Sequence, residues 1–327
     1  MIRFATIGSN FIVHSFLEAT AFVTDFKYVA AYSRSEDTAL ELAKKYGAAD
    51  VYTDFSKLAN SELVDAVYVA SPNSLHFEQA LLLINNKKHV LCEKPLVSNM
   101  REYQILEKAA QANGVVLMEA MKSVHCPGFA AVLENLPKLG IIRSVNFNFS
   151  QYSSRYNKFK QGIVENAFDP SFSNGALMDI GVYPLHTTLA VFGRPNDVKA
   201  SAIKLPESID VSGTLLLSYD TFIATILYSK VSSHEGNQIQ GENATMLIDK
   251  ISDIQNIEIR YHDGRVEKIE VAKGATMSYE IIKFVTAICG EINDDILATT
   301  RLQMEMLDTI REQLQIVYPA DLVEDRN

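Results

Sequence analysis

Short apolar runs alternate with helical patterns over the first 120 residues, and this alternation restricts the possible folds more than any other feature of the chain. Each run is rich in aliphatic or β-branched residues, which predicts a strand buried on both faces. Strands that alternate with helices form right-handed βαβ units, so the sequence predicts an α/β fold with a doubly wound parallel sheet. The six predicted strands are Ile2–Ile7, Phe26–Tyr32, Val51–Tyr52, Ala66–Ala70, His89–Glu93 and Val115–Glu119.

The pattern changes after about residue 122. Strands then follow one another with few helices between them, which predicts an α+β domain with an open, mostly antiparallel sheet. We therefore expect two domains, residues 1–122 and residues 123–327. The predicted strands of the second domain are Ile141–Tyr152, Val198–Leu205, Val211–Tyr219, Phe222–Val231, Ala244–Asp249 and Ile257–His262, and helical patterns cover Asp179–Phe192, Tyr279–Cys289 and Thr299–Val317.

Charge and cysteine content exclude several classes of protein. The 327 residues hold 30 Lys and Arg against 40 Asp and Glu, a net charge of −10 without a basic stripe, so we expect neither nucleic acid nor an anionic membrane as a partner. Cys92, Cys126 and Cys289 are too widely spaced for a zinc site, so we expect no metal and a reduced, cytoplasmic protein. With no leader pattern and no apolar run of about 20 residues, we expect no signal peptide and no transmembrane helix.

The end of the first predicted strand resembles a phosphate-binding turn. In a doubly wound sheet of the Rossmann type, ligands bind at the carboxyl ends of the strands, and a helix that starts there attracts an anion. Gly8-Ser9-Asn10-Phe11-Ile12-Val13 keeps the first glycine of the G-x-G-x-x-G/A fingerprint, while Asn10 and Val13 replace the other two. Asparagine tolerates a left-handed backbone better than most residues. The turn fits either a dinucleotide site or an ordinary strand–helix connection.

The end of the second strand bears on the choice of cofactor. An acidic residue there would bind the ribose 2′-hydroxyl of NAD, whereas an arginine accommodates the 2′-phosphate of NADP. Ser33 and Arg34 stand at this point, with no acid before Glu36, and this favours NADP over NAD. The alternative is a solvated arginine beside a helix cap.

Glu93-Lys94-Pro95 follows the fifth strand, where a lysine side chain points toward the ligand crevice. The proline restricts Lys94 to extended geometry and is compatible with a cis bond. The alternative is an ordinary exposed ion pair of Glu93 and Lys94.

These elements occur in an order that resembles the Gfo/Idh/MocA oxidoreductases over nearly the whole chain. Two elements are specific for this family when they occur together. They are Glu93-Lys94-Pro95, at this position along the chain, and Asp179-Ile180-Gly181-Val182-Tyr183, about 85 residues later. The other elements that carry the resemblance are the Gly8 turn, Ser33-Arg34, Ser71-Pro72-Asn73 with His76, Cys92 and Leu96 beside Lys94, Glu119-Ala120, and the flanking residues from Gly175 to Pro184.

The resemblance implies that residues 1–122 bind NADP, by preference, or NAD. It also implies that residues 123–327 bind a small-molecule substrate and form a homodimer through their sheet. The implied reaction is hydride transfer between the nicotinamide and a sugar, polyol, diol or related carbonyl compound. Lys122 stands where the dihydrodiol type commonly has tryptophan, which leaves the substrate open. The implied cofactor-binding residues are Gly8, Ser9, Asn10, Phe11, Ile12, Ser33, Arg34, Ser71, Pro72, Asn73, His76, Glu93, Lys94, Glu119 and Lys122.

Carried over by position, Lys94, Asp179 and Tyr183 are the catalytic candidates. A carbonyl that accepts a hydride must also gain a proton; free tyrosine titrates near ~10, and a neighbouring ammonium favours the phenolate. We hypothesise that Tyr183 is the general acid or base, that Lys94 is coupled to it, and that Asp179 anchors a substrate hydroxyl. His186, about one helical turn beyond Tyr183, either reaches the substrate or packs inside the helix layer.

Two other functions stay open at this point. The altered glycine turn is compatible with a dinucleotide-binding sensor that has no turnover, although a pure binder has no need of both Lys94 and Tyr183. The same architecture also supports a redox-assisted glycosidase, which would retain its cofactor tightly and consume none.

Overall fold

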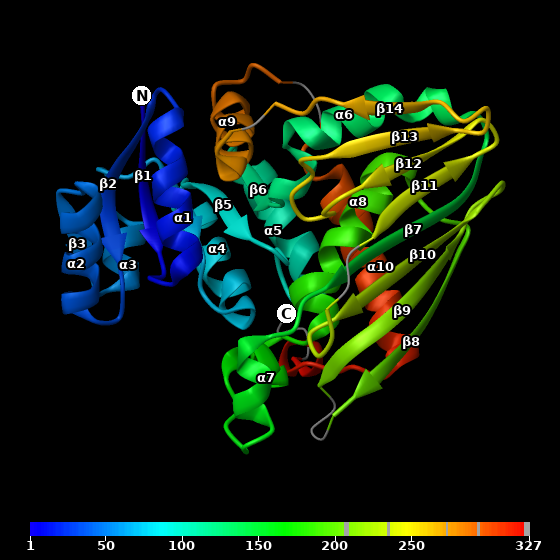
Figure 1. The fold of residues 1–327 in the computed structure, drawn as a ribbon. Helices are drawn as coiled ribbons and strands as arrows, with labels where there is room; N and C mark the ends of the chain where they lie inside the picture. Colours follow the sequence, from blue (N-terminus) through cyan, green and yellow to red (C-terminus); the bar gives the residue numbers. More distant parts are fainter. Residues whose placement is uncertain (206–208, 234–235, 273, 293–294, 324–327) are drawn as a thin grey trace. The chain divides into compact units, whose positions relative to one another are not determined.

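The computed structural model describes residues 1–327 except 206–208, 234–235, 273, 293–294 and 324–327. The chain forms two units: Met1–Met121 with Gly274–Ala298, and Lys122–Lys273 with Thr299–Asn327 (Figure 1). This differs from the domain limits expected above, because the segment around α9 (Thr276–Ile288) returns to the N-terminal unit.

The N-terminal unit contains the predicted parallel sheet, which confirms the fold class. Its strands are β1 (Ile2–Ile7), β2 (Phe26–Tyr32), β3 (Asp50–Tyr52), β4 (Ala66–Val69), β5 (His89–Glu93) and β6 (Leu117–Ala120). They lie in the order β3-β2-β1-β4-β5-β6, and every neighbouring pair is parallel. The direction of winding reverses between β1 and β4, which is where ligands bind in sheets of this type.

The helices of this unit begin and end at recognisable caps. Ser35 accepts a hydrogen bond from the Thr38 N–H, and Gly47, at φ +80°, ends the helix that follows. Asn99 caps a second helix in the same way through the Glu102 N–H. The helices are α1 (Phe11–Ala19), α2 (Glu36–Tyr46), α3 (Phe55–Ala59), α4 (His76–Asn85), α5 (Met100–Asn113) and α9, with 3₁₀ turns η1 (Thr20–Phe22) and η2 (Asn73–Leu75).

Aromatic rings form the centre of the core in the N-terminal unit. The Phe16 ring stacks on Tyr68 with 3.7 Å between centroids, and Phe4 stacks on Phe26 at 4.0 Å. Phe284 of α9 meets the Phe26 ring edge-on and is itself almost fully buried. Helix α9 therefore completes a core that the first 121 residues begin, and this explains why it belongs to this unit and not to the second.

The second unit contains an eight-stranded, mostly antiparallel sheet in the order β14-β13-β12-β11-β7-β10-β9-β8. Only the pair β7 and β10 is parallel among the described pairings. A tight hairpin joins β9 to β10 at Tyr219–Phe222, where the Tyr219 N–H donates to the Phe222 carbonyl. The strands are β7 (Ile142–Ser150), β8 (Asp197–Lys204), β9 (Asp210–Ser218), β10 (Ile223–Ser229), β11 (Asn237–Gly241), β12 (Ala244–Ile248), β13 (Ile257–Tyr261) and β14 (Val266–Ile269).

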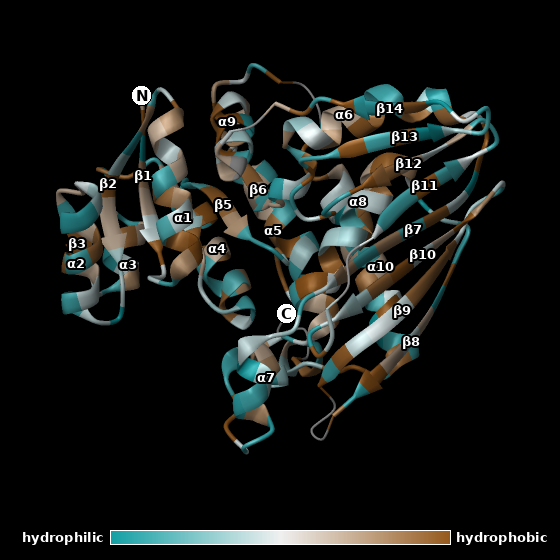
Figure 2. Cartoon of the chain, in the orientation of Figure 1, coloured by the Kyte–Doolittle hydropathy of each residue, from teal (hydrophilic) through white to brown (hydrophobic). Residues whose placement is uncertain are grey.

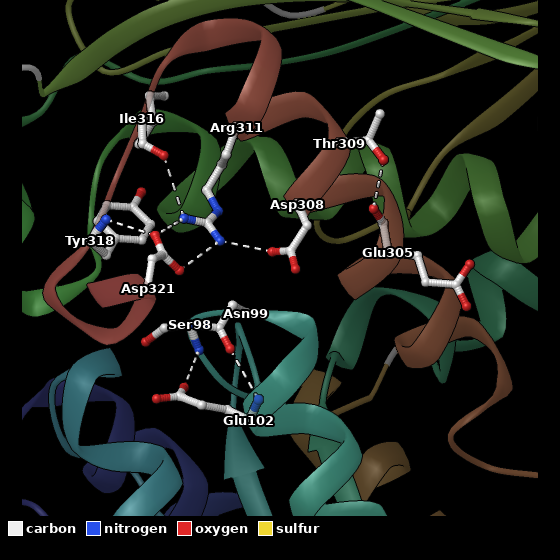
Figure 3. Close-up of polar contacts among 10 residues, drawn as sticks. All are labelled: Ser98, Asn99, Glu102, Glu305, Asp308, Thr309, Arg311, Ile316, Tyr318 and Asp321. Carbon is white, nitrogen blue, oxygen red and sulfur yellow. Dashed lines mark hydrogen bonds and ion pairs between the residues drawn. The ribbon is translucent and has the colours of Figure 1, made fainter. Parts of the chain in front are cut away.

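Helices cover one face of this sheet. Helix α8 packs on β7 and β10, and Gln313 of α10 exchanges hydrogen bonds with the backbone of Val198 and Ala200 on β8. The buried Arg311 guanidinium of α10 pairs with Asp308 and Asp321, which fixes the final turn of the chain (Figure 3). The helices are α6 (Pro127–Asn135), α7 (Ser154–Phe159), α8 (Val182–Phe192) and α10 (Ala298–Leu314), with a π-helical turn η7 (Leu177–Gly181) and 3₁₀ turns η3 (Lys122–Val124), η4 (Leu136–Leu139), η5 (Asn166–Phe168), η6 (Pro170–Phe172) and η9 (Pro319–Leu322).

The hydropathy of the strands reflects how the two sheets are covered. Figure 2 colours most of β5 as apolar, as expected for a strand covered on both faces, whereas β13 alternates between apolar and polar residues. The other face of the second sheet therefore carries polar residues with scattered exposed aliphatic ones. Among the described residues, no helix has both the length and the apolar character needed to cross a bilayer.

Candidate active site

The turn after β1 brings two backbone segments into close contact. Gly8 has a φ of +106°, and a Cβ atom placed on it would lie 2.6 Å from the Ala70 carbonyl oxygen at the end of β4. Only glycine fits both the left-handed backbone and this contact. The Ala70 N–H donates to the Ile7 carbonyl beside it. A backbone held this closely at the reversal point fits the pyrophosphate of a dinucleotide.

Asn10 acts as a helix cap and not as a substitute for glycine. Its φ is −80°, so the left-handed backbone considered for it in the sequence analysis is not used. Its Oδ1 accepts hydrogen bonds from the Ile12 and Val13 N–H groups, and its Nδ2 donates to the Ala70 carbonyl. Val13 is fully buried and would lie 3.5 Å from a Cβ on Gly8. Both departures from the glycine fingerprint therefore stabilise the turn locally.

The end of β2 presents Arg34 to solvent. The Ser33 N–H donates to the Tyr52 carbonyl of β3, and Ser35 caps α2. Arg34 stands between them and is exposed. A guanidinium at this edge, with neither Asp nor Glu at positions 33–35, suits a phosphate on the ribose better than it suits a free hydroxyl.

His76 connects the loops after β4 and β5. Its ring is fully buried, with Nδ1 at 3.0 Å from the Pro95 carbonyl oxygen and Nε2 at 2.9 Å from the Ser71 carbonyl oxygen. Burial lowers the pKa of His76, the two carbonyls raise it, and the charge of Lys94 lowers it further. A neutral imidazole donates to only one of the two oxygens, so the imidazole holds both loops by one hydrogen bond and one contact.

Glu93 and Glu119 hold the Lys94 loop from its two sides. The Tyr68 hydroxyl donates to Glu93 Oε1, and the Lys94 N–H donates to the other carboxylate oxygen at 3.3 Å. The buried Glu119 carboxylate accepts from the Leu96 N–H at 3.0 Å. The Lys94–Pro95 peptide bond is cis. Glu93 therefore supports the loop through these two hydrogen bonds.

The same loop is secured where it enters α5. The Ser98 N–H donates to the Glu102 carboxylate and the Glu102 N–H donates to Asn99 Oδ1, both at 3.0 Å (Figure 3). This reciprocal cap satisfies N–H groups at the start of α5 that the helix itself leaves unpaired. Lys94 is thus carried on a loop whose two ends are both fixed.

The structure gathers most of the predicted cofactor residues at one edge of the N-terminal sheet. Gly8 to Ile12, Ser33, Arg34, Ser71 to Asn73, His76, Glu93, Lys94 and Glu119 all lie in or beside the segments that follow β1, β2, β4, β5 or β6. Lys122 is different, because it belongs to the second unit, where its turn η3 packs against α8.

In the second unit, Asp179 and Tyr183 occupy a change of helical type. Asp179 lies in the π-helical turn η7, and Tyr183 lies in the first turn of α8. The Tyr183 ring meets Phe149 of β7 edge-on at 5.4 Å. Turns of π type often occur at functional sites, because they redirect side chains out of the regular helical positions.

His186 packs inside the helix layer, which is one of the two positions expected for it. It is 3% exposed, and its Nδ1 lies 2.9 Å from Gln303 Oε1 on α10. Burial lowers the pKa of His186 to about 4, so the ring is neutral at physiological pH. These contacts favour a structural role over substrate binding.

Two buried charged residues contact the turn that carries Asp179 and were not predicted from the sequence. The Lys230 ammonium, just after β10, lies 2.8 Å from Asp179 Oδ2. Asp210, at the start of β9, accepts from the Leu177 N–H at 2.6 Å, and burial raises its pKa to about 6. Both residues stand at the ends of apolar strands, and a charged residue at such a position is the signal in the sequence that points to them.

The two-unit fold and the residues at the carboxyl edge of the N-terminal sheet are those of a dinucleotide-dependent oxidoreductase. Comparison with known proteins supports the same class. Residues 2–121 match the model described as "Oxidoreductase family, NAD-binding Rossmann fold", and residues 137–247 match the GFO/IDH/MocA C-terminal domain. The chain is 46% identical to a scyllo-inositol 2-dehydrogenase (NADP(+)), IolU, of Bacillus subtilis, over 98% of this chain and 99% of that one. The chain therefore belongs to the Gfo/Idh/MocA oxidoreductase family and is an enzyme that uses a nicotinamide cofactor.

More distant relatives have the same architecture. A trans-1,2-dihydrobenzene-1,2-diol dehydrogenase of Xenopus tropicalis is 25% identical over 96% of each chain. The crystal structure of KijD10, a 3-ketoreductase from Actinomadura kijaniata in complex with NADP and TDP-benzene, superposes with a TM-score of 0.85. That structure is 23% identical and covers 95% of this chain and 97% of its own, so it supports the fold.

The Gly8 contact predicts the behaviour of a single-methyl variant. Gly8→Ala should weaken NADPH binding at least about tenfold, because the methyl group must displace the Ala70 carbonyl and the turn with it. Fluorescence titration with NADPH measures this. Gly47→Ala is the matched control: Gly47 also has a positive φ, but nothing lies within 4 Å of its Cβ position. The control should lose about 1 kcal/mol of stability and no affinity. Unchanged affinity in Gly8→Ala would contradict the assignment of the turn.

Proposed function

We propose that this enzyme is an NADP-dependent dehydrogenase of a cyclic polyol. The observation that carries the proposal is the 46% identity, over nearly the full length of both chains, to a scyllo-inositol 2-dehydrogenase (NADP(+)). The exposed Arg34 at the end of β2 supports the choice of NADP. A polyol presents several hydroxyls in fixed geometry, so its site needs hydrogen-bonding groups in addition to those that move the proton.

The cofactor supplies a nicotinamide that accepts or donates the hydride. In this proposal the Gly8–Ile12 turn holds the pyrophosphate and Arg34 the 2′-phosphate, while Pro72 and Asn73 border the dinucleotide from the loop after β4. The contacts that join these loops support the assignment, because an edge that is already ordered loses little entropy when the cofactor binds.

Three side chains handle the substrate in this proposal. Tyr183 takes the proton from the carbinol hydroxyl in the oxidative direction and returns it in the reductive one. The ammonium of Lys94 donates to the same oxygen and stabilises negative charge that develops there. The Asp179 carboxylate accepts a hydrogen bond from a second hydroxyl and so selects polyols over simple alcohols. Lys94 and Asp179 act in these roles through a full charge and Tyr183 through its hydroxyl proton, so variants of similar size that lack these groups test the roles.

Loss of either proposed catalytic group should reduce turnover strongly. We expect Lys94→Met and Tyr183→Phe each to lower kcat for oxidation of an inositol by about 10²–10⁴-fold, the usual contribution of a proton-transfer group. NADPH affinity should change little in Tyr183→Phe. Steady-state assays that follow NADPH absorbance give both quantities.

The matched controls for these variants are Lys88→Met and Tyr46→Phe. Lys88 binds the carbonyls of Ser61 and Val64, and Tyr46 contacts His14, so neither serves the proposed site. Both controls should keep wild-type kcat. Near-wild-type turnover in Lys94→Met and in Tyr183→Phe would refute the assigned roles.

Cofactor choice provides an independent prediction. Arg34→Ala should raise the KM for NADP at least about tenfold and leave the KM for NAD nearly unchanged, because only the 2′-phosphate needs the guanidinium. Arg143→Ala, which removes an exposed arginine paired with Glu242 in the second unit, is the control. Equal losses with both cofactors, or a wild-type preference for NAD, would show that Arg34 does not select NADP.

We further propose a homodimer formed through the uncovered face of the second sheet. This face holds aliphatic side chains on the neighbouring strands β8, β9 and β10, among them Ile203, Leu216, Ile223 and Leu227, which are 42–64% exposed. Exposed aliphatic groups on adjacent strands favour a second copy with the same face. Sedimentation should show a dimer, and Leu216→Glu with Leu227→Glu should give monomers, whereas Leu40→Glu on α2 should not. A monomeric wild-type enzyme would contradict this.

A cytoplasmic location is part of the proposal. It is supported by the three cysteines, which are free thiols, two of them buried.

A further inference from the structure

Lys230 is a charged side chain in an unusual place. It is only 3% exposed, directly after β10, where its own N–H donates to the Val211 carbonyl. Transfer of an ammonium out of water costs several kcal/mol unless partners compensate for the lost hydration. The partners of Lys230 therefore show what its burial serves.

The ammonium joins two segments of the second unit. It lies 2.8 Å from Asp179 Oδ2 on the π-helical turn, and it donates to the Ala167 carbonyl at 2.6 Å. It also lies 4.8 Å from the centre of the Phe168 ring, a cation–π contact. Phe168 in turn packs against Tyr156 and Phe159 of α7. Lys230 thus connects the segment around α7 with the turn that carries Asp179.

Groups other than Lys230 hold the backbone of that turn, although the charge of Lys230 also lowers the pKa of one of them, Asp210. The Leu177 N–H is bound by the buried Asp210 carboxylate, and Gly181 lies against the Tyr228 ring, where a Cβ would come within 3.1 Å. The main chain of the turn is therefore fixed by β9 and β10. What Lys230 adds is a buried partner that directs the Asp179 carboxylate, a side chain that is itself 32% exposed.

We propose that Lys230 is a positioning residue for Asp179: its buried ammonium orients the carboxylate so that the opposite side of that carboxylate receives a substrate hydroxyl. This rests on the role proposed above for Asp179. It assigns Lys230 to substrate recognition through Asp179 alone, and it requires that Lys230 have no effect on catalysis once the Asp179 charge is gone.

Four proteins test this: wild type, Asp179→Asn, Lys230→Met and the double variant. We expect Lys230→Met to lower kcat/KM for an inositol by about 10²-fold, mainly through KM, as loss of a group that orients another commonly does. The KM for NADP should stay within about twofold of wild type. In the Asp179→Asn background, Lys230→Met should change kcat/KM by less than about twofold, because the two residues act as one unit.

The comparison of the double variant with Asp179→Asn is decisive and does not need the single Lys230 variant to fold. The double variant removes both members of the ion pair, whereas Lys230→Met leaves the Asp179 carboxylate without its buried partner. If Lys230→Met fails to fold, Lys230→Gln, whose amide still donates to the Ala167 carbonyl, replaces it. Lys204→Met is the control, since Lys204 donates to the Leu314 carbonyl on another part of the unit and should keep full activity.

The outcomes separate the two proposals. Full activity in Asp179→Asn would overturn the role of Asp179 itself. A damaged Asp179→Asn with a wild-type Lys230→Met would leave that role intact and overturn the positioning role. A further tenfold loss in the double variant relative to Asp179→Asn would also overturn it, because Lys230 would then act by a route that bypasses Asp179.

Discussion

The backbone just after β1 runs against the backbone just after β4, and this close approach sets the geometry of the binding edge. Gly8 leaves no room for a side chain before the Ala70 carbonyl, while Asn10 from the same turn donates to that carbonyl. The two strands are neighbours at the point where the sheet reverses its winding. Because Gly8 has no Cβ, the turn after β1 can lie against the end of β4, at the point where ligands bind in sheets of this type.

From this contact, side chains tie each loop to the next along the edge. Asn10 reaches the end of β4, His76 joins the loops after β4 and β5, and Glu119 after β6 binds the loop that carries Lys94. Each connection pairs a polar side chain with backbone groups, and two of these side chains, His76 and Glu119, are buried. The cofactor edge is therefore rigid before any ligand arrives. In the second unit, the buried Asp210 carboxylate holds the backbone of the Asp179 turn by the same means, and Lys230 forms an ion pair with the Asp179 side chain.

Local signals in the sequence were sufficient for the N-terminal sheet and for much of the edge. Ser35 and Gly47 mark both ends of α2, because a cap and a left-handed terminus depend on single residue types. By contrast, β11 and the exposed strand β14 lack a run of apolar residues and exist through pairing with their neighbours, which no local pattern encodes. Helices α6 and α7, of nine and six residues, were also not predicted.

Long-range packing explains the remaining differences. Helix α9 belongs to the first unit because Phe284 meets Phe26, a contact across more than 250 residues of chain that periodicity cannot show. Lys230 follows an apolar strand, and a lysine at such a point is usually solvated; only the tertiary structure places Asp179 and Ala167 around it. The catalytic roles themselves came from the family resemblance and not from spacing, and they stay predictions.

The most direct test of the central claim follows the hydride itself. The enzyme is incubated with NADP and scyllo-inositol deuterated at its carbinol carbons, and the reduced cofactor is examined by NMR. The account predicts deuterium at C4 of the nicotinamide, on one face only, together with a slower rate than for the unlabelled polyol. Reduced cofactor without deuterium, or no reduction with any inositol while NADPH still binds, would contradict it.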